Sequence, residues 1–568
     1  MKKLIVLLIL IIFSSGFSAG AVSDFARSRI FYDNQYELLI THPNENSRIT
    51  TSSRMSFLGD SDTRHRLFIN SEEINRTPDG FFTYYAELEI GENTFIIRNG
   101  ENIETLVITR ETPEPWLPPE TFYFPVEIFG SVEGDYIPRF AYFDDDLHAK
   151  TPLMSGTTFR IIGERGEYYI LADGTAMFKS HVFQLGRTLR TVVSGGEIFM
   201  RGNNVSVSFD VTENPLYEII FDDNKAILII YADGDLSDLS TGAPYIIEIS
   251  KSVQTSPDAI IYEIEFERVP VGYIVGFNDG KMNIDFRFPP VLLSDAFILL
   301  DAGHGGADPG ALGPPGEFGS MEKDFNLYVA QTARDYLLGL GMQVILIRDT
   351  NEFVQIMDRV EYFALQPDIV VSVHANSAPL SSNFANLSGP LMYYTLDISE
   401  RAADEMIELI NYMVSGFTPH APLPWHRRRN FAMARYTGGP SMLFEMGFLC
   451  NPAEYELMLN IPYLDRLGLS LGMSIEQYIK NLMVAEDPEV IHTFAPFPPP
   501  PMIYEIEDAV PVLLQIRPEA SSMEDALFKY ILFISSVMLC GILLWLPSGF
   551  IRSVKNRNAL MRSLHTEE

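Results

Sequence analysis

Residues 298–310, ILLDAGHGGADPG, run from an apolar segment into an acid, a histidine and several glycines. Glycines beside a functional group keep side chains away, so that a ligand or a metal ion can approach the backbone closely. The pattern predicts that His304 is a functional residue at the end of a strand. It supplies only half of an active site, and the other half must come from elsewhere in the chain.

Three further residues have the chemistry to complete such a site. Glu322 lies in the first turn of a predicted helix that Ser320 can N-cap. His374 closes the apolar segment DIVVSV, and Glu445 closes PSMLF. Two histidines and one carboxylate are a common set of zinc ligands that leaves a fourth position for water. A second carboxylate can then take the proton of that water and pass it to a leaving nitrogen.

Each of these residues also has a purely structural interpretation. An acid in the first turn of a helix is favourable to the helix dipole without any metal. A histidine that ends a strand can be a satisfied polar group. An unpaired carboxylate among apolar neighbours, as at Glu445, is costly, which favours a functional role there. Spacing along the chain does not decide between these interpretations.

The elements that must position these residues alternate between strands and helices after Asp295. Apolar segments such as FILLDAG, QVILIRDT and DIVVSVHAN alternate with helix-like stretches of period 3.6 at 322–341, 399–415 and 464–484. This alternation predicts a three-layer α/β domain over residues 296–484.

The motifs of this domain resemble those of a known family. DAGHGGADPGALG, EKDFNL, VILIRDT, DRVEYFA, DIVVSVHANSA and PSMLFEMGFLCNPAEYELM occur in the order found in the zinc-dependent N-acetylmuramoyl-L-alanine amidases, the amidase-3 type of peptidoglycan hydrolase. The resemblance covers about residues 296–480. It implies a mixed or largely parallel sheet, His304, Glu322 and His374 as ligands of Zn²⁺, and Glu445 as the catalytic acid and base.

The implied reaction is hydrolysis of the amide that joins the lactyl group of N-acetylmuramic acid to L-alanine. Asn376, Arg427, Arg428 and Arg429 are the candidates for substrate binding, although a solvated basic edge is the favoured interpretation of the three arginines. Cys450 departs from the family pattern and is expected to be a small buried residue rather than a nucleophile. No helix that blocks the active site is expected between residues 399 and 429, so the enzyme should need no activator.

Three β-rich modules are predicted ahead of the α/β domain. Alternating segments with turn residues between them predict an Ig-like sandwich over 36–111, followed by the proline-rich joint TPEPWLPP. Short strands with glycine turns predict an SH3-like domain over 120–184 and a further β-rich domain over 185–290, which resembles wall-targeting β-domains. These modules could bind glycan, recruit division or wall-synthesis proteins, or act as spacers.

The two ends of the chain carry apolar segments. Residues 1–21 read as a signal peptide, with an uncleaved anchor as the alternative. Residues 530–551 contain no charge and are long enough to cross a bilayer of about 30 Å, while a buried core helix is the alternative. With a proline-rich stalk at 485–528 and a basic tail at 552–568, they predict a single-pass protein of the cytoplasmic membrane. The catalytic ectodomain is then expected in the periplasm or cell-wall space.

The charge balance excludes one class of partner. The chain has 75 acidic residues against 41 lysines and arginines, a net charge of -34, which argues against binding to nucleic acid. The expected partners are peptidoglycan and the membrane. Two other functions remain open: a catalytically silent wall-binding scaffold or activator, and a zinc hydrolase that acts on another amide.

Overall fold

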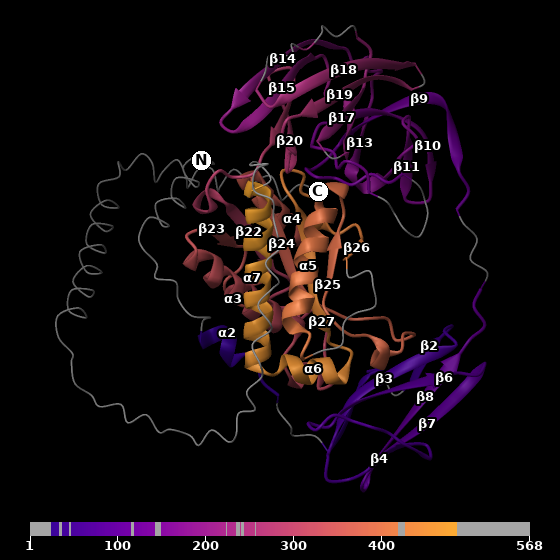
Figure 1. The fold of residues 1–568 in the computed structure, drawn as a ribbon. Helices are drawn as coiled ribbons and strands as arrows, with labels where there is room; N and C mark the ends of the chain where they lie inside the picture. The colour runs from indigo at the N-terminus through magenta and orange to yellow at the C-terminus, as the bar shows by residue number, and fades with distance from the viewer. Residues whose placement is uncertain are drawn as a thin grey trace, which may run out of the picture. The chain divides into compact units, whose positions relative to one another are not determined.

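The computed structural model describes residues 24–484 apart from short gaps (Figure 1). The gaps are 33–36, 45–46, 115–118, 142–148, 223, 235–238, 240–243, 256 and 418–425. The predicted signal peptide, stalk, membrane span and basic tail all lie outside the described residues.

The α/β domain is built on one mixed sheet with the strand order β23-β22-β24-β27-β25-β26. All neighbouring strands in it are parallel except β25 and β27. This agrees with the mixed, largely parallel sheet that the family resemblance implied. The strands are β22 (Phe297–Ala302), β23 (Gln343–Leu346), β24 (Ile369–Asn376), β25 (Leu391–Tyr394), β26 (His426–Arg428) and β27 (Ser441–Phe448).

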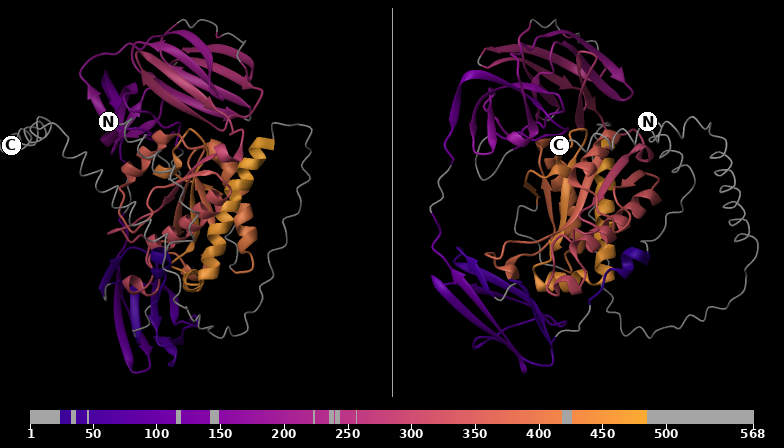
Figure 2. Two further views of the ribbon diagram at one scale, coloured as in Figure 1. Left: turned by 90° about the vertical axis from the view of Figure 1, so that its left-hand side faces the viewer. Right: turned by 180° about the vertical axis from the view of Figure 1, so that it is seen from behind.

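Helices cover one face of this sheet. Figures 1 and 2 show α3, α5 and the yellow-orange α7 running along it, and α7 packs against both of the others. Ile298 and Leu300 of β22 point into the core on this side, whereas Leu299 packs on the opposite face with Phe363 and Tyr436. Burial on both faces explains why the strand sequences are continuously apolar. The helices are α3 (Glu322–Gly339), α4 (Ile356–Val360), α5 (Glu400–Val414), α6 (Pro452–Met458) and α7 (Ile461–Val484).

The part of the chain ahead of the α/β domain is rich in β-sheet, as predicted. After the short helix α2 (Asp24–Ser28), residues 38–110 form a three-stranded sheet, β1-β3-β6, and a five-stranded sheet, β2-β8-β7-β4-β5. The assignment of this module as Ig-like stays a prediction. Its strands are β1 (Leu38–His42), β2 (Ser47–Thr50), β3 (Arg54–Ser61), β4 (Leu67–Ile69), β5 (Glu72–Glu73), β6 (Phe81–Glu87), β7 (Gly91–Asn99) and β8 (Asn102–Arg110).

Two more β-rich stretches follow. The first is a five-stranded sheet, β12-β11-β10-β9-β13, and the second consists of the four-stranded sheets β14-β15-β21-β20 and β16-β17-β19-β18. Their assignments as SH3-like and wall-targeting stay predictions. The strands are β9 (Phe122–Val132), β10 (Thr158–Arg165), β11 (Tyr168–Leu171), β12 (Ala176–Phe178), β13 (Val182–Leu185), β14 (Val193–Arg201), β15 (Asn204–Val211), β16 (Leu216–Asp222), β17 (Lys225–Tyr231), β18 (Ile246–Thr255), β19 (Asp258–Phe266), β20 (Gly272–Asn278) and β21 (Lys281–Arg287).

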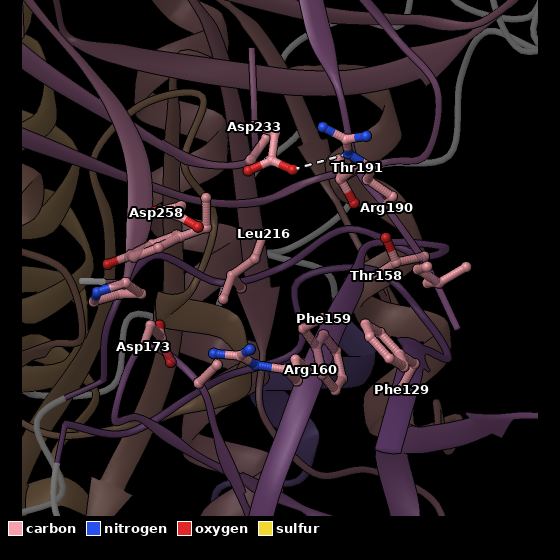
Figure 3. Close-up of a pocket in the computed structure, with 15 residues that line it drawn as sticks. Phe129, Thr158, Phe159, Arg160, Asp173, Arg190, Thr191, Leu216, Asp233 and Asp258 are labelled. Carbon is pink, nitrogen blue, oxygen red and sulfur yellow. Dashed lines mark hydrogen bonds and ion pairs between the residues drawn. The ribbon is translucent and has the colours of Figure 1, made fainter. Parts of the chain in front are cut away.

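A cavity of about 210 Å³ lies where these two stretches meet (Figure 3). Several of its charged side chains pair with each other or with nearby residues. Arg190 Nε donates to Asp233 over 3.1 Å, and Asp173 pairs with the fully buried Arg139. Because the charges of Arg190, Asp233 and Asp173 have partners within the protein, we interpret this cavity as part of the contact between the two β-rich stretches.

Arg287, the last residue of β21, connects the third β-rich stretch to the α/β domain. Its guanidinium is buried and donates to the carbonyl oxygens of Pro367 and Gly438, at 2.6 and 2.8 Å. It also pairs with Asp368 over 2.7 Å. Burial raises the pKa of Asp368, and the charge of Arg287 opposes that rise. The arginine therefore offsets part of the effect that burial has on this partly buried carboxyl.

The predicted membrane location is contradicted. Within the described residues no helix is long and apolar enough to cross a membrane. The longest described helix, α7, carries Asp465, Arg466 and Glu476 among its apolar residues and packs one face on the core. The single-pass location predicted for the chain is corrected on this finding. The segment on which that prediction rested, 530–551, lies outside the described residues.

We predict that Arg287→Met lowers the free energy of unfolding by about 3 to 5 kcal/mol, because the partly buried Asp368 loses its ion-pair partner and the buried carbonyls of Pro367 and Gly438 lose a donor. The midpoint of urea unfolding, followed by circular dichroism, measures this change. Arg201→Met is the matched control, since Arg201 forms a more exposed pair with Asp285, and it should cost no more than about 1 kcal/mol. Equal effects of the two substitutions would contradict the prediction.

Candidate metal centre and active site

Three of the candidate residues lie at one edge of the sheet because their strands are neighbours. β24 is parallel to both β22 and β27 and lies between them. His374 of β24 is the register partner of Glu445 of β27, and Ala302 at the end of β22 pairs with Val373. His304 follows two residues later. The carboxyl ends of adjacent parallel strands therefore bring these side chains together.

The fourth residue, Glu322, comes from the start of α3. The helix begins at Glu322 with Met321 as its N-cap residue, and Asp324 accepts a hydrogen bond from the Met321 N–H at 3.1 Å. The prediction that Ser320 caps this helix is wrong. Its hydroxyl lies 3.0 and 2.9 Å from the carbonyl oxygens of Arg29 and Phe31 instead. Asp324 supplies the hydrogen-bonding group that satisfies the helix start.

His304, Glu322 and His374 form a compact cluster of potential ligands. Glu322 Oε1 lies 3.1 Å from His304 Nε2 and 2.8 Å from His374 Nδ1. One ligand atom from each residue can be chosen so that all three lie within 4.8 Å of one another. Ligand atoms in a tetrahedral zinc site with bonds of about 2.1 Å are separated by roughly 3.4 Å. The donor types and their separations therefore suit a divalent metal ion.

Two glycines of the 298–310 segment allow this close approach. A Cβ at Gly303 would lie 2.2 Å from the ring of His374. A Cβ at Gly310 would lie 2.5 Å from Glu322 Oε2, and Gly310 also has a φ of +68°. The glycines that surround His304 in the sequence thus leave room for the other two members of the cluster.

The charges of the cluster reinforce one another. Burial lowers the pKa of His304, but the carboxylates of Glu322 and Asp308 outweigh that effect, so the pKa lies above its ordinary value. Burial raises the pKa of Glu322, yet the hydrogen bonds and charges of the two histidines bring it well below the usual range. Glu322 is therefore held as a carboxylate, which is the form that binds a metal.

Glu445 lines the same cavity and is placed for a different task. Its Oε2 is buried and has no hydrogen-bond partner among the described residues. Burial raises the pKa of Glu445 well above its ordinary value, and the nearby negative charge of Glu322 raises it further. An unpartnered carboxyl oxygen directed into a cavity beside a metal cluster fits an acid and base that exchanges protons with a bound molecule.

Sequence reasoning missed the residues that hold His304 in place. Asp308 Oδ2 lies 2.8 Å from His304 Nδ1, so His304 directs its Nε2 toward Glu322. A carboxylate on the second ring nitrogen fixes the tautomer and orientation of a metal-binding histidine. The only signal in the sequence is an acid four residues after the histidine, and acids in loops are common.

Two buried arginines hold the backbone around His304. Arg348 Nε donates to the Ala302 carbonyl over 2.7 Å, and Arg359 Nη2 donates to the His304 carbonyl over 2.6 Å. Arg359 also forms a buried ion pair with Asp301. His304 has a backbone φ of +61°. Residues other than glycine adopt this conformation uncommonly, so that surrounding contacts must constrain it here. The arginines supply that constraint.

The cavity around the cluster has a volume of about 540 Å³. Asn376 lines it, whereas Arg427, Arg428 and Arg429 are not among its lining residues. Arg428 pairs with Asp397 and donates to the Ala149 carbonyl over 3.1 Å. The polar and charged residues that line the cavity are Asp301, His304, Asp308, Glu322, Gln355, Arg359, Ser372, His374, Asn376, Ser377 and Glu445.

No described residue between 400 and 429 lines this cavity. The helix in that region, α5, packs against α7 and β25. The expectation that no helix blocks the site and that no activator is needed stays a prediction. The buried position of Cys450 also agrees with its predicted role as a small core residue.

Comparison with known proteins gives one family match. Residues 298–477 match the model of the amidase-3 family, described as N-acetylmuramoyl-L-alanine amidase. The N-acetylmuramoyl-L-alanine amidase AmiC of Neisseria meningitidis is 28% identical over 224 residues, which cover 32% of this chain and 53% of that protein. The probable cell wall amidase LytH of Staphylococcus epidermidis is 29% identical over 251 residues, which cover 40% of this chain and 80% of LytH.

Among solved structures, the catalytic domain of CwlV, an N-acetylmuramoyl-L-alanine amidase from Bacillus (Paenibacillus) polymyxa var. colistinus, is 28% identical. The similarity covers 33% of this chain and 98% of that domain, with a TM-score of 0.29. The family match lies within the α/β domain and does not extend to the β-rich modules.

We predict that the affinity for Zn²⁺ falls as the pH is lowered from 8 to 6, because the metal must displace the proton that the raised pKa of His304 retains. The loss should approach about tenfold per pH unit for each displaced proton. Competition with a chromophoric chelator measures it. Glu445→Gln should bind Zn²⁺ like the wild type, whereas an affinity independent of pH, or unchanged in His304→Ala, would contradict the assignment of His304.

We also predict that Asp308→Ala weakens Zn²⁺ binding by about 10- to 100-fold, because the imidazole of His304 loses the group that orients it. The same chelator competition gives the affinity. Asp349→Ala is the control, since Asp349 pairs with Arg334 and is not among the residues that line the cavity. An Asp308→Ala protein with wild-type affinity would show that the Arg348 and Arg359 contacts suffice.

Proposed function

We propose that the amidase-3 type domain over residues 298–477 is a zinc-dependent N-acetylmuramoyl-L-alanine amidase. The substrate is peptidoglycan, and the bond cleaved is the amide between the lactyl group of N-acetylmuramic acid and L-alanine. The observation that carries the proposal is the presence of Glu445 in the same cavity as His304, Glu322 and His374. Cleavage would detach the stem peptide from the glycan, as wall remodelling or the separation of daughter cells requires.

The residues present fit zinc. Two imidazoles and one carboxylate form a donor set that zinc enzymes use, and the cavity leaves room for water and substrate beside it. His304, Glu322 and His374 would hold the ion, and Asp308 would orient His304. Zinc at this position supplies an activated water molecule and polarises the carbonyl of the scissile amide.

Glu445 performs the proton transfers of the reaction. Its carboxylate accepts the proton of the attacking water and then donates it to the amide nitrogen as the carbon–nitrogen bond breaks. A raised pKa suits both roles, because the group must take up a proton and release it within one turnover. The absence of a hydrogen-bond partner for Oε2 among the described residues leaves this atom available to the reactants.

Asn376 is the candidate for contact with the substrate. It ends β24 two residues after His374 and lines the cavity. Its amide can donate to a substrate carbonyl and accept from an N–H, which suits a peptide or an acetamido group. Substrate binding by Arg427, Arg428 and Arg429 stays a prediction.

A second function, a catalytically silent scaffold or activator that binds the wall, uses the same fold without chemistry. The intact set of ligand residues and the unpartnered Glu445 oxygen favour the enzyme. A zinc hydrolase that acts on another amide shares every feature of the metal centre. The products of digestion distinguish the three functions.

We predict that the purified protein digests isolated sacculi and releases peptides with new amino-terminal L-alanine, which mass spectrometry identifies. Removal of metal by a chelator should abolish the digestion, and added Zn²⁺ should restore it. Glu445→Gln should lower the rate by about 10² to 10⁴-fold because proton transfer is lost, while Zn²⁺ binding stays intact.

Glu408→Gln, at an exposed position of α5, is the matched control and should retain the wild-type rate. Digestion that yields other new ends would assign the metal centre to another amide. Complete inactivity of the zinc-loaded wild type would support the silent scaffold.

A further inference from the structure

The first β-module forms hydrogen bonds to the loop that follows β24, the strand that carries His374. Within residues 38–110, Ser56 of β3 donates through its N–H to the Leu380 carbonyl and through its hydroxyl to the Ser382 carbonyl, both over 2.6 Å. Tyr85 of β6 donates to the Ser381 carbonyl over 3.1 Å. These three bonds fix consecutive residues of a loop that begins directly after Asn376.

The same contact has an apolar core. Leu58 of β3 is fully buried against Phe384, Phe448 and Cys450 of the α/β domain. Thr41 of β1 adds a hydrogen bond to the Pro314 carbonyl over 3.0 Å. Polar and apolar contacts therefore hold this module against the domain that carries the metal centre.

A cavity of about 340 Å³ lies at this junction, next to the metal centre. Ser377 lines both this cavity and the one that contains His304, Glu322, His374 and Glu445. Both cavities also border the loop before α3, where Ala311 lines one and Leu312 lines the other. The complete lining of the junction cavity is His42, Arg48, Leu58, Leu312, Ser377, Ala378, Pro379, Leu380, Phe384 and Cys450.

Arg48 is the charged group of this junction cavity. Its guanidinium forms no ion pair or hydrogen bond with the described residues, and no acidic side chain is among the residues that line the cavity. Burial lowers the pKa of His42, and the charge of Arg48 lowers it further. Burial raises the pKa of the Cys450 thiol to about 11. Histidine and cysteine are therefore kept uncharged, and Arg48, an exposed residue of β2, lines the cavity without a counter-ion among the described residues.

This arrangement differs from the cavity of Figure 3, where Arg190 and Asp233 pair with each other. In a chain with a net charge of -34, an arginine without an acidic partner is a notable local excess of positive charge. The volume is small and most of the lining side chains are apolar, so the side chains offer few hydrogen-bonding groups to a sugar. They suit a short peptide segment that ends in, or carries, a carboxylate.

We propose that the first β-module completes the substrate site, and that the junction cavity binds a carboxylate of the peptide on the nitrogen side of the scissile amide through Arg48. This inference rests on the proposed amidase function. The peptide leaves the metal centre past Ser377 and enters the junction cavity, where Arg48 forms a charge-assisted hydrogen bond with it. The module thereby sets the preference for acidic over amidated peptides.

Two muramoyl peptides test the proposal, one with free carboxylates and one with the same carboxylates converted to amides. Arg48→Gln should raise KM for the free acid about tenfold or more, with kcat and zinc content unchanged, because one charge-assisted contact is lost. KM for the amidated peptide should not change. Arg54→Gln, in the same module and paired with Glu87 on an exposed surface, is the matched control and should affect neither substrate.

A binding measurement separates this inference from the proposed activity. Calorimetric titration of L-alanyl-D-glutamate and of its amidated form does not depend on turnover, and the wild type should bind the acid more tightly while Arg48→Gln binds both equally weakly. Arg48-dependent binding without any hydrolysis would overturn the amidase function and leave the binding site. Normal hydrolysis with KM and peptide affinity unaffected by Arg48→Gln would overturn the binding site and leave the amidase.

Discussion

The structure depends on holding one carboxylate between two imidazoles. A buried Glu322 alone would be costly, and the two histidines within 3.1 Å offset that cost in the metal-free protein. Only a fixed frame keeps three such groups at this separation. The parallel register of β22, β24 and β27 positions His304, His374 and Glu445. The first turn of α3 positions Glu322. A bound divalent cation would take the place of the proton that the raised pKa of His304 retains.

The rest of the molecule can be understood as support for this frame. Arg348 and Arg359 fix the backbone on both sides of Gly303, so that His304 keeps a conformation it would not adopt freely. Arg287 connects the third β-rich stretch to the loop before β24. The first β-module holds the loop after β24 through Ser56. The strand that carries His374 is thus fixed at both of its ends by modules outside the family match.

Much of the catalytic domain could be predicted from the sequence, because apolar strands that end in polar residues mark the functional edge of an α/β sheet. His304, Glu322, His374 and Glu445 were proposed in this way and through the family motifs, and the structure brings them to one cavity. Partners such as Asp308 depend on loop geometry that no periodicity encodes. The prediction that Ser320 caps α3 was wrong because Asp324 accepts a hydrogen bond from the N–H of Met321 at the start of the helix. Arg428 lies at the sheet edge because β25 separates β26 from β27, an order that local patterns do not reveal. The membrane location, inferred from terminal segments, was contradicted by the described helices.

X-ray absorption at the zinc edge of the zinc-loaded protein tests the central claim most directly, because it reports the atoms bound to the metal. We expect one zinc per chain with only nitrogen and oxygen ligands at about 2.0 to 2.2 Å, including the scattering signature of two imidazoles. His374→Ala should remove one of these imidazoles. A sulfur ligand at about 2.3 Å, or the absence of bound zinc, would contradict the assignment of the metal centre to His304, Glu322 and His374.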